Sequence, residues 1–262
     1  MEINPLKPSK YRVPALEKGL DILEKLAQSS KPVSLTQLSQ QLGRTNNEIY
    51  RMLTCLEQRG YILRDDVSGN YALSLRLYEL ALTHSPLDKL LSSAQPLMEG
   101  LATSLNESCH LSVMDGFELL VICQALTPGK VRISVQVGGR FSPVNTVSGR
   151  ILLANMPPDR CLACLNTAPE FQRMTDDEKQ ALKTQLENIR NEGVSYAESE
   201  TIFGVNDYAV LVGNPQVGMA AALAISSLTS LKSAKAKKEL FSSLQVCAAT
   251  ITQNAGIALN YA

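Results

Sequence analysis

Apolar side chains recur at helical spacing in three successive segments near the start of the chain. The apolar stripe predicted for the first helix, which starts at Pro14, comprises Leu16, Leu20, Leu23 and Ala27. Two further helices are expected after the capping residues Ser34 and Thr45. Each is followed three residues later by Gln or Glu, and such a pair satisfies free backbone N–H groups. We expect these two helices to end at Gly43 and Gly60.

Two short β-prone runs follow, at residues 61–64 and 71–73, on either side of a polar segment that contains Gly69. This pattern predicts a β-hairpin. Two helices joined by a short turn and followed by a hairpin form a winged helix-turn-helix. The sequence therefore predicts this fold for residues 13–74, preceded by a flexible arm at residues 1–12.

The third helix has a polar face with the residue types that read DNA. Asn can bond adenine and Arg can bond guanine, each through two hydrogen bonds. Thr45 and the free N–H groups behind it suit a phosphate. In the hairpin, Asp65 and Asp66 repel phosphate, so we expect contacts from Arg64 or from the backbone of residues 68–70. The predicted DNA-binding residues are Arg44, Thr45, Asn46, Asn47, Tyr50, Arg51 and Arg64.

The remaining two-thirds of the chain mixes strand and helix patterns. Residues 75–105 are predicted to form linker helices, with Pro96 near a helix start. Residues 106–262 are predicted to form an α+β domain, because strands have helices before, between and after them. The predicted strands are 110–114, 118–125, 131–137, 194–197, 208–212 and 217–225, and the predicted helices are 148–155, a helix capped by residues 175–178, and 233–260.

Composition and charge limit the possible functions. The 262 residues have no net charge, so a uniformly basic nucleic-acid-binding surface is excluded and only a local patch remains possible. Residues 44–64 have an excess of two positive charges. The chain has no apolar run long enough to span a membrane, and residues 1–19 have no signal-peptide core. We therefore expect a cytoplasmic protein.

The chain also lacks the usual signatures of metal sites and catalysis. Cys161 and Cys164 form a lone C-x-x-C pair, and only His84 and His110 could complete a metal set, so we expect these cysteines to be core residues of a helix. Cys109 and His110 point to opposite faces if they lie in a strand, which argues against a nucleophile pair. We expect no metal, no cofactor and no catalytic residue.

The whole chain resembles the IclR family of bacterial transcriptional regulators. The matching segments are VPALEKGLDIL at 13–23, IYRML at 49–53, LEQRGY at 56–61, YAL at 71–73, HLSV at 110–113, VGGR at 137–140, SGRILLA at 148–154 and AALAIS at 221–226. The resemblance implies a dimer or tetramer, a winged helix-turn-helix and a C-terminal GAF-like domain. That domain is expected to bind a small molecule, often a carboxylate, which changes the affinity for the operator.

The predicted effector site combines this resemblance with helix-terminus chemistry. Residues 147–150 open a helix, and the free N–H groups of a helix N-terminus form a ready carboxylate site. The resemblance implies backbone donors at Val147 and Ser148, an acidic lining from Glu198 and Glu200, and a hydroxyl at Ser226. Leu211 stands where the family often has Cys or Pro. The predicted effector-binding residues are Arg132, Val147, Ser148, Gly149, Glu198, Glu200, Leu211 and Ser226.

The sequence therefore favours a ligand-responsive transcriptional regulator that binds a near-palindromic operator. Two alternatives stay open. The first is an enzyme that acts on a small organic acid, with Glu198 and Glu200 as its acid and base and the N-terminal domain for oligomerisation. The second is an adaptor that uses its winged helix for protein contacts. The polar face of the third helix, which has no Leu or Phe, favours DNA over the adaptor.

Overall fold

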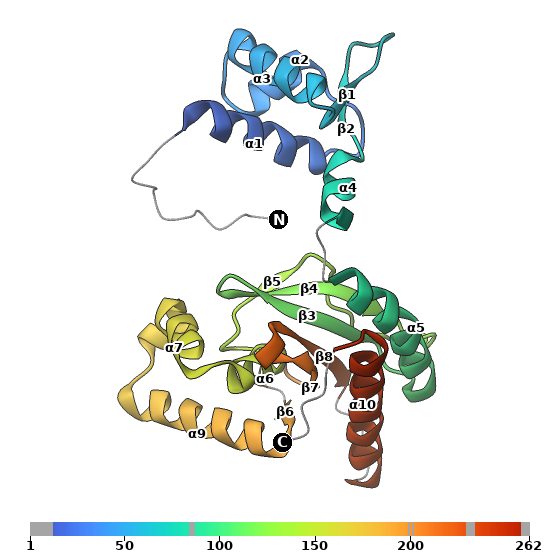
Figure 1. The fold of residues 1–262 in the computed structure, drawn as a ribbon, viewed down its shortest axis with the longest axis vertical. Helices are drawn as coiled ribbons and strands as arrows, with labels where there is room; N and C mark the ends of the chain where they lie inside the picture. Colours follow the sequence, from blue (N-terminus) through green and yellow to red (C-terminus); the bar gives the residue numbers. More distant parts are fainter. Residues whose placement is uncertain (1–12, 84–86, 199, 201, 229–233, 258–262) are drawn as a thin grey trace. The chain divides into compact units, whose positions relative to one another are not determined.

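The computed structural model describes residues 13–83, 87–198, 200, 202–228 and 234–257, and it divides the chain into two compact units (Figure 1). The division falls between Ser85 and Pro86. The predicted arm at residues 1–12 lies outside the described part. Each unit is considered by itself below.

The first unit is a winged helix-turn-helix, as predicted. Its elements are α1 (Pro14–Ala27), α2 (Leu35–Gln41), α3 (Asn46–Gln58), β1 (Ile62–Arg64), β2 (Tyr71–Leu73) and α4 (Arg76–Thr83). Ser34 and Thr45 are the N-caps of α2 and α3, and both capping boxes are formed. The strands pair as an antiparallel hairpin. The predicted local signals are therefore confirmed.

The buried face of α1 differs from the prediction. Ile22 and Leu26 are buried against α3 and the hairpin, whereas Leu16 and Leu20 are exposed. The helix carries two adjacent apolar stripes, and the small unit covers only one of them. Spacing alone cannot identify which stripe is covered, because both fit the helical period.

The second unit is an α+β domain built on one six-stranded sheet. Its helices are α5 (Leu87–Leu105), α6 (Val147–Asn155), α7 (Pro158–Thr167), α8 (Pro169–Arg173), α9 (Asp176–Glu192), a short 3₁₀ turn (Pro215–Val217) and α10 (Ala234–Asn254). Its strands are β3 (Cys109–Asp115), β4 (Glu118–Ala125), β5 (Arg140–Phe141), β6 (Val194–Glu198), β7 (Val205–Asn214) and β8 (Met219–Leu228). The antiparallel order is β5-β4-β3-β8-β7-β6.

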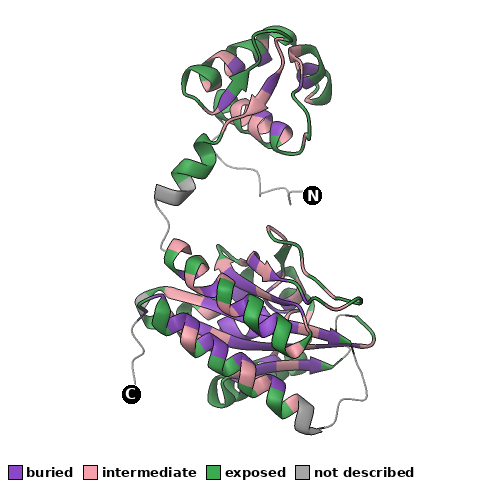
Figure 2. Cartoon of the chain, turned by 90° about the vertical axis from the view of Figure 1, so that its right-hand side faces the viewer, coloured by how far each residue is buried: buried purple, intermediate pink, exposed green. Residues whose placement is uncertain are grey.

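Helices cover both faces of this sheet, so the unit has two apolar cores. One core joins the sheet to α5 and α10, and the other joins it to α6, α7, α8 and α9. Figure 2 shows the buried residues concentrated in the strands and on the inner sides of the helices. Because side chains alternate along a strand, neighbouring residues of one strand face different cores. The arrangement is the GAF-like fold that was predicted.

Helix α5 belongs to this domain and is not a linker. Leu90, Ala94 and Met98 lie in the core that α5 shares with the sheet and α10. The predicted linker at residues 75–105 is therefore wrong for its second half. Pro96 lies inside α5, on its exposed side, and not at a helix start.

The segment of residues 131–137 is not a strand. Val131 and Val137 are exposed, and the short strand β5 begins only at Arg140. Ile133 and Val135 are partly buried. The alternation of apolar and polar residues therefore marks a segment that packs one side on the domain but pairs with no described strand. The last helix also ends earlier than predicted, at Asn254, and Gly256 with φ of +71° follows it. Ala258, predicted to face the core, lies outside the described residues.

Candidate DNA interface and effector site

Helix α3 separates its apolar and polar residues cleanly. Ile49 and Leu53 are fully buried in the core of the first unit. Four of the predicted DNA-binding residues share the opposite, exposed face: Asn46, Asn47, Tyr50 and Arg51. This face offers amide, phenol and guanidinium groups that can reach base edges and phosphates in a major groove.

The N-terminus of α3 already holds a carboxylate. The Thr45 backbone N–H and hydroxyl both donate to the Glu48 carboxylate, at 3.2 and 2.9 Å, and Lys18 Nζ lies 2.6 Å from Glu48 Oε1. The hydrogen bond from Lys18 and those from Thr45 lower the pKa of Glu48 to about 2. The backbone N–H and hydroxyl of Thr45, which were expected to contact a phosphate, are therefore already hydrogen-bonded to Glu48.

We expect a lysine substitution in α1 to change the titration of Glu48. Lys18→Met removes the nearby positive charge and should raise the pKa of Glu48 by about one unit or more. The stabilisation from Glu48 is present above its ordinary pKa of 4.5 and is lost as the pH falls towards 2. Carbon-13 NMR of the Glu48 carboxyl measures this. Lys25→Met, on the same helix, should leave the titration unchanged, and equal effects of both substitutions would contradict the assignment.

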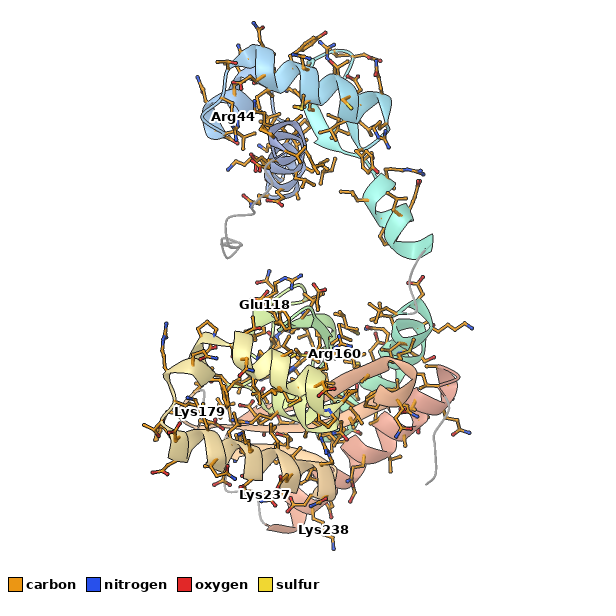
Figure 3. The ribbon with its side chains drawn as sticks, turned by 60° about the vertical axis from the view of Figure 1, so that its left-hand side comes forward. Arg44, Glu118, Arg160, Lys179, Lys237 and Lys238 are labelled. Carbon is orange, nitrogen blue, oxygen red and sulfur yellow. The ribbon has the colours of Figure 1, made fainter. Side chains whose placement is uncertain are left out.

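Arg44, at the turn between α2 and α3, is also engaged (Figure 3). Its Nη2 atom lies 3.4 Å from Asp21 Oδ2 of α1, and about two-thirds of its side chain is buried. The contact ties α1 to the turn before α3. Arg44 therefore positions α3, and its charge is partly balanced within the chain.

The wing is organised by the acidic residue that was expected to repel DNA. The Asp65 carboxylate accepts hydrogen bonds from the backbone N–H and hydroxyl of Ser68, at 2.6 and 2.7 Å, and these bonds lower its pKa. The N–H groups of Gly69 and Asn70 also have acceptors within the wing. The backbone N–H groups of residues 68–70, which were expected to contact DNA, are therefore all hydrogen-bonded within the wing. Arg64 stays available, with its guanidinium 5.8 Å from the centre of the Tyr71 ring.

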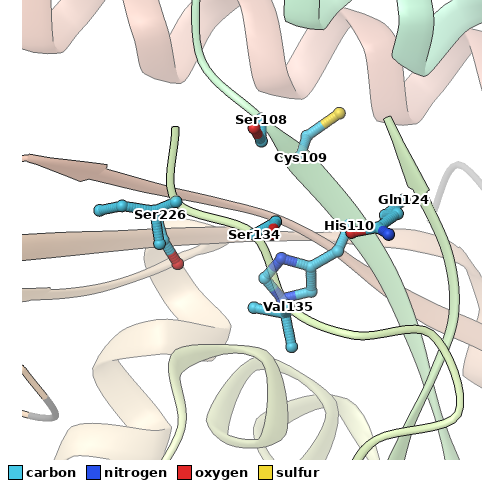
Figure 4. Close-up of a pocket in the computed structure, with 8 residues that line it drawn as sticks. Ser108, Cys109, His110, Gln124, Ser134, Val135 and Ser226 are labelled. Carbon is cyan, nitrogen blue, oxygen red and sulfur yellow. The ribbon is translucent and has the colours of Figure 1, made fainter. Parts of the chain in front are cut away.

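The second unit contains a narrow pocket, called the cavity below, which leaves no room for a water molecule in this structure (Figure 4). It lies beneath the segment of residues 133–135 and is lined by Ser108, Cys109, His110, Gln124, Ile133, Ser134, Val135 and Ser226. Burial lowers the pKa of His110 to about 4, so the imidazole is neutral at pH 7. His110 keeps some accessible surface where it borders the cavity. Cys109 and His110 point to opposite sides of β3, as predicted.

Helix α6 is positioned by a cap and a glycine contact. Its N-cap is Thr146, whose hydroxyl accepts a hydrogen bond from the Gly149 N–H at 3.1 Å. Val147 and Ser148 are buried in the first turn of α6. A Cβ atom on Gly149 would lie 2.2 Å from the backbone of Pro143. Gly149 therefore lets α6 approach residues 142–146 closely. This packing is sufficient to explain a glycine at position 149, and no contact with a ligand is needed.

The two predicted acidic residues lie on opposite sides of the sheet. Glu198, at the end of β6, pairs with Lys237 of α10 at 2.5 Å and accepts a hydrogen bond from Tyr196, and these contacts lower the pKa of Glu198. Glu200 pairs with Arg150 of α6. Glu198 thus belongs to the α10 side, away from α6. The enzyme alternative required Glu198 and Glu200 to work together, and this geometry separates them.

The remaining predicted effector residues are dispersed. Leu211 packs into the core beneath α6, and Ser226 lines the cavity while donating a hydrogen bond to Asp207 Oδ1 at 2.6 Å. Arg132 is exposed. Sequence reasoning did not single out Arg150 and Asp207 as candidates for this region. Arg150 could have been found from the sequence, because it is the one charged residue in the otherwise uncharged helical segment 147–154.

The predicted packing of Cys161 and Cys164 within a helix is confirmed. Cys161 and Cys164 lie on α7, with Cys164 buried, and burial raises the pKa of both thiols. Among the described residues there is no group of three His, Cys, Asp or Glu side chains that could hold a metal ion. Within the same part of the chain, none of the helices is long and apolar enough to cross a membrane.

Comparisons with known proteins agree with this architecture. The chain matches the family model "Bacterial transcriptional regulator IclR C-terminal" over residues 84–253 and the "IclR helix-turn-helix domain" over residues 15–66. It is 25% identical over 223 residues to the transcriptional repressor IclR of Escherichia coli K12, covering 84% of this chain and 81% of that protein. It is 27% identical over 259 residues to the regulator KdgR of Dickeya chrysanthemi, covering 98% and 84%.

Solved structures show the same fold. An IclR homolog from Microbacterium hydrocarbonoxydans, complexed with 4-hydroxybenzoate, has a TM-score of 0.73 at 22% identity, covering 92% of this chain and 99% of that chain. The Thermotoga maritima IclR has a TM-score of 0.67 at 21% identity, covering 92% and 98%. With a winged helix-turn-helix, a GAF-like domain and family matches in both units, the chain belongs to the IclR family of bacterial transcriptional regulators.

Proposed function

We propose that the chain acts in the cytoplasm as a dimer or tetramer that binds a near-palindromic operator through α3 and the wing. The observation that carries this proposal is the exposed polar face of α3, opposite its buried apolar face. Two copies would place their α3 helices in successive major grooves, about 34 Å apart. The operator would then consist of two similar half-sites.

A small carboxylate in the second unit is proposed to change the affinity for the operator. The cavity and the α6 region contain the polar groups for such a ligand, and one relative of the same fold is complexed with 4-hydroxybenzoate. Control of DNA binding requires that the ligand bind the two states of the protein with different affinities. Equal operator affinities with and without the bound ligand would exclude this control.

Selection of bound DNA from a random pool tests the proposal. The full-length chain should enrich a site with two half-sites, and footprinting at a stated salt concentration should show protection of both. The salt concentration is fixed because phosphate contacts make the affinity strongly salt-dependent. A chain that enriches no sequence and protects no DNA would exclude the regulator and favour the adaptor.

We expect Arg51→Ala to weaken operator binding by about 1–3 kcal/mol if the guanidinium contacts a base. Arg51 is exposed on the same face of α3 as Asn47, so the substitution should not disturb the core. Arg160→Ala in α7 is the matched control, because it removes the same charge from an exposed position of the second unit (Figure 3). Titration of the selected operator measures both variants. Equal operator affinities of Arg51→Ala and wild type would show that this face of α3 does not contact the DNA.

A further inference from the structure

Arg150 is a buried cation on the inner side of α6. Only 4% of its side chain is exposed, and the neighbouring residues of α6 are apolar and buried. A buried guanidinium is costly unless it is paired and hydrogen-bonded. Its Nε atom is buried with no hydrogen-bond partner among the described residues. The pairing of this cation is therefore incomplete.

The partner that Arg150 has is a surface residue 50 positions away in the chain. Glu200 lies in the irregular segment between β6 and β7, and its two carboxylate oxygens lie 2.6 and 2.7 Å from Nη1 and Nη2 of Arg150. The Glu200 side chain is 46% exposed. One member of the pair is thus held inside the domain, while the other can enter water at little cost.

Arg150 is also electrostatically linked to the cavity region. Asp207 of β7 feels the charges of both Arg150 and Glu200, and burial raises its pKa. Ser226, which lines the cavity, donates to Asp207 at 2.6 Å. Two hydroxyls on the strands beneath α6, those of Ser112 and Ser195, are also buried without a described partner. The interface between α6 and the sheet therefore contains buried polar atoms that have no described hydrogen-bond partner.

We propose that Arg150 anchors the carboxylate of the effector and that Glu200 occupies this anchor until the effector displaces it. The inference rests on the proposed function, since it assigns the ligand-binding group of that regulator. A guanidinium presents a planar fork that matches a carboxylate through two parallel hydrogen bonds. An incoming carboxylate accepts a hydrogen bond first from the unpartnered Nε of Arg150 and then from Nη2. The second of these bonds replaces the one between Nη2 and Glu200.

The exchange makes the site selective for acids. The incoming carboxylate replaces one negative charge by another, so the buried cation stays paired throughout. An uncharged amide of the same shape carries no negative charge to replace that of Glu200. Arg150 therefore keeps its ion pair with Glu200, and the amide does not form the paired hydrogen bonds to the guanidinium. Release of Glu200 breaks its ion pair with Arg150, so binding removes the contact between Glu200 and α6.

The test uses Glu200→Gln in the full-length chain, with acetate and 4-hydroxybenzoate as probes and acetamide and 4-hydroxybenzamide as their uncharged counterparts. Removing the internal carboxylate should let both acids bind at least tenfold more tightly than they bind to wild type, as measured by calorimetry. The amides should show no gain. Glu198→Gln is the matched control, because it removes a neighbouring carboxylate that pairs with Lys237 on the other side of the sheet.

Two results would overturn the inference. One is a Glu200→Gln variant that binds the acids no more tightly than wild type or Glu198→Gln does. The other is a gain that persists in the double variant Arg150→Gln, Glu200→Gln. The first comparison needs no change at Arg150, so a poorly folded double variant does not remove the test. A chain that selects DNA from the random pool but fails here remains a regulator with a different anchor.

Discussion

Replacing Gly149 with alanine is expected to destabilise the second unit by about 3 kcal/mol. The added Cβ would lie 2.2 Å from both Cα and O of Pro143, whereas carbon atoms in contact are normally about 3.5–4.0 Å apart. Both partners are backbone, so no side-chain rotation relieves the clash. Residues 142–146 must move away from α6, which also strains the Thr146 cap. Urea unfolding of the full-length chain measures the loss.

Gly100→Ala provides the matched control for this experiment. Gly100 lies on the exposed side of α5 in the same unit, and nothing lies within 4 Å of its added Cβ. Alanine is favoured over glycine inside a helix, so this variant should gain about 0.5–1 kcal/mol. The two substitutions should therefore change stability in opposite directions. Equal stability of the two variants would show that α6 does not approach Pro143 as described.

Acidification from pH 6.5 to pH 4 should cost the chain about 2–3 kcal/mol of unfolding free energy through His110. Burial lowers the pKa of His110 from 6.5 to about 4. Within this interval the unfolded chain takes up a proton that the folded chain excludes. His110 therefore has no effect on stability above pH 6.5, and its full cost is present below about pH 4. Unfolding free energies measured at several pH values test the slope.

His110→Gln removes the titration while keeping a polar side chain at the cavity. Other groups titrate in both proteins, including Asp207, whose raised pKa acts in the opposite direction. The difference between the two stability curves therefore isolates His110. It should change by about 2–3 kcal/mol between pH 7 and pH 4. Parallel curves would mean that the folded chain protonates His110 as readily as the unfolded chain.

The sequence predicted features that depend on short-range chemistry. The capping boxes at Ser34, Thr45 and Thr175 are all formed, because each involves residues three positions apart. The winged helix-turn-helix follows from patterns of similar range. These local signals, together with the family resemblance, were sufficient for the fold class.

Features that depend on packing between distant segments were not predictable. The choice between two apolar stripes of α1 is made by α3 and the hairpin. The separation of Glu198 from Glu200 depends on the end of β6, after which strand alternation no longer holds. The pairing of Arg150 with Glu200 spans 50 residues and has no sequence period to reveal it. For these reasons, the groups proposed to bind the effector became visible only in the fold.

Strands β3 and β4 present different residues to their two sides. His110 and Gln124 border the cavity. The residues directly before them contact α5 on the reverse side, where the Cys109 thiol donates to the Met98 carbonyl and the Cys123 thiol to Gln95. The cavity wall and the surface on which α5 packs are thus the two sides of the same strands. Since α5 begins at Leu87, just after the unit boundary, the helix through which the chain enters the second unit packs directly on the reverse side of the strands that form the cavity wall.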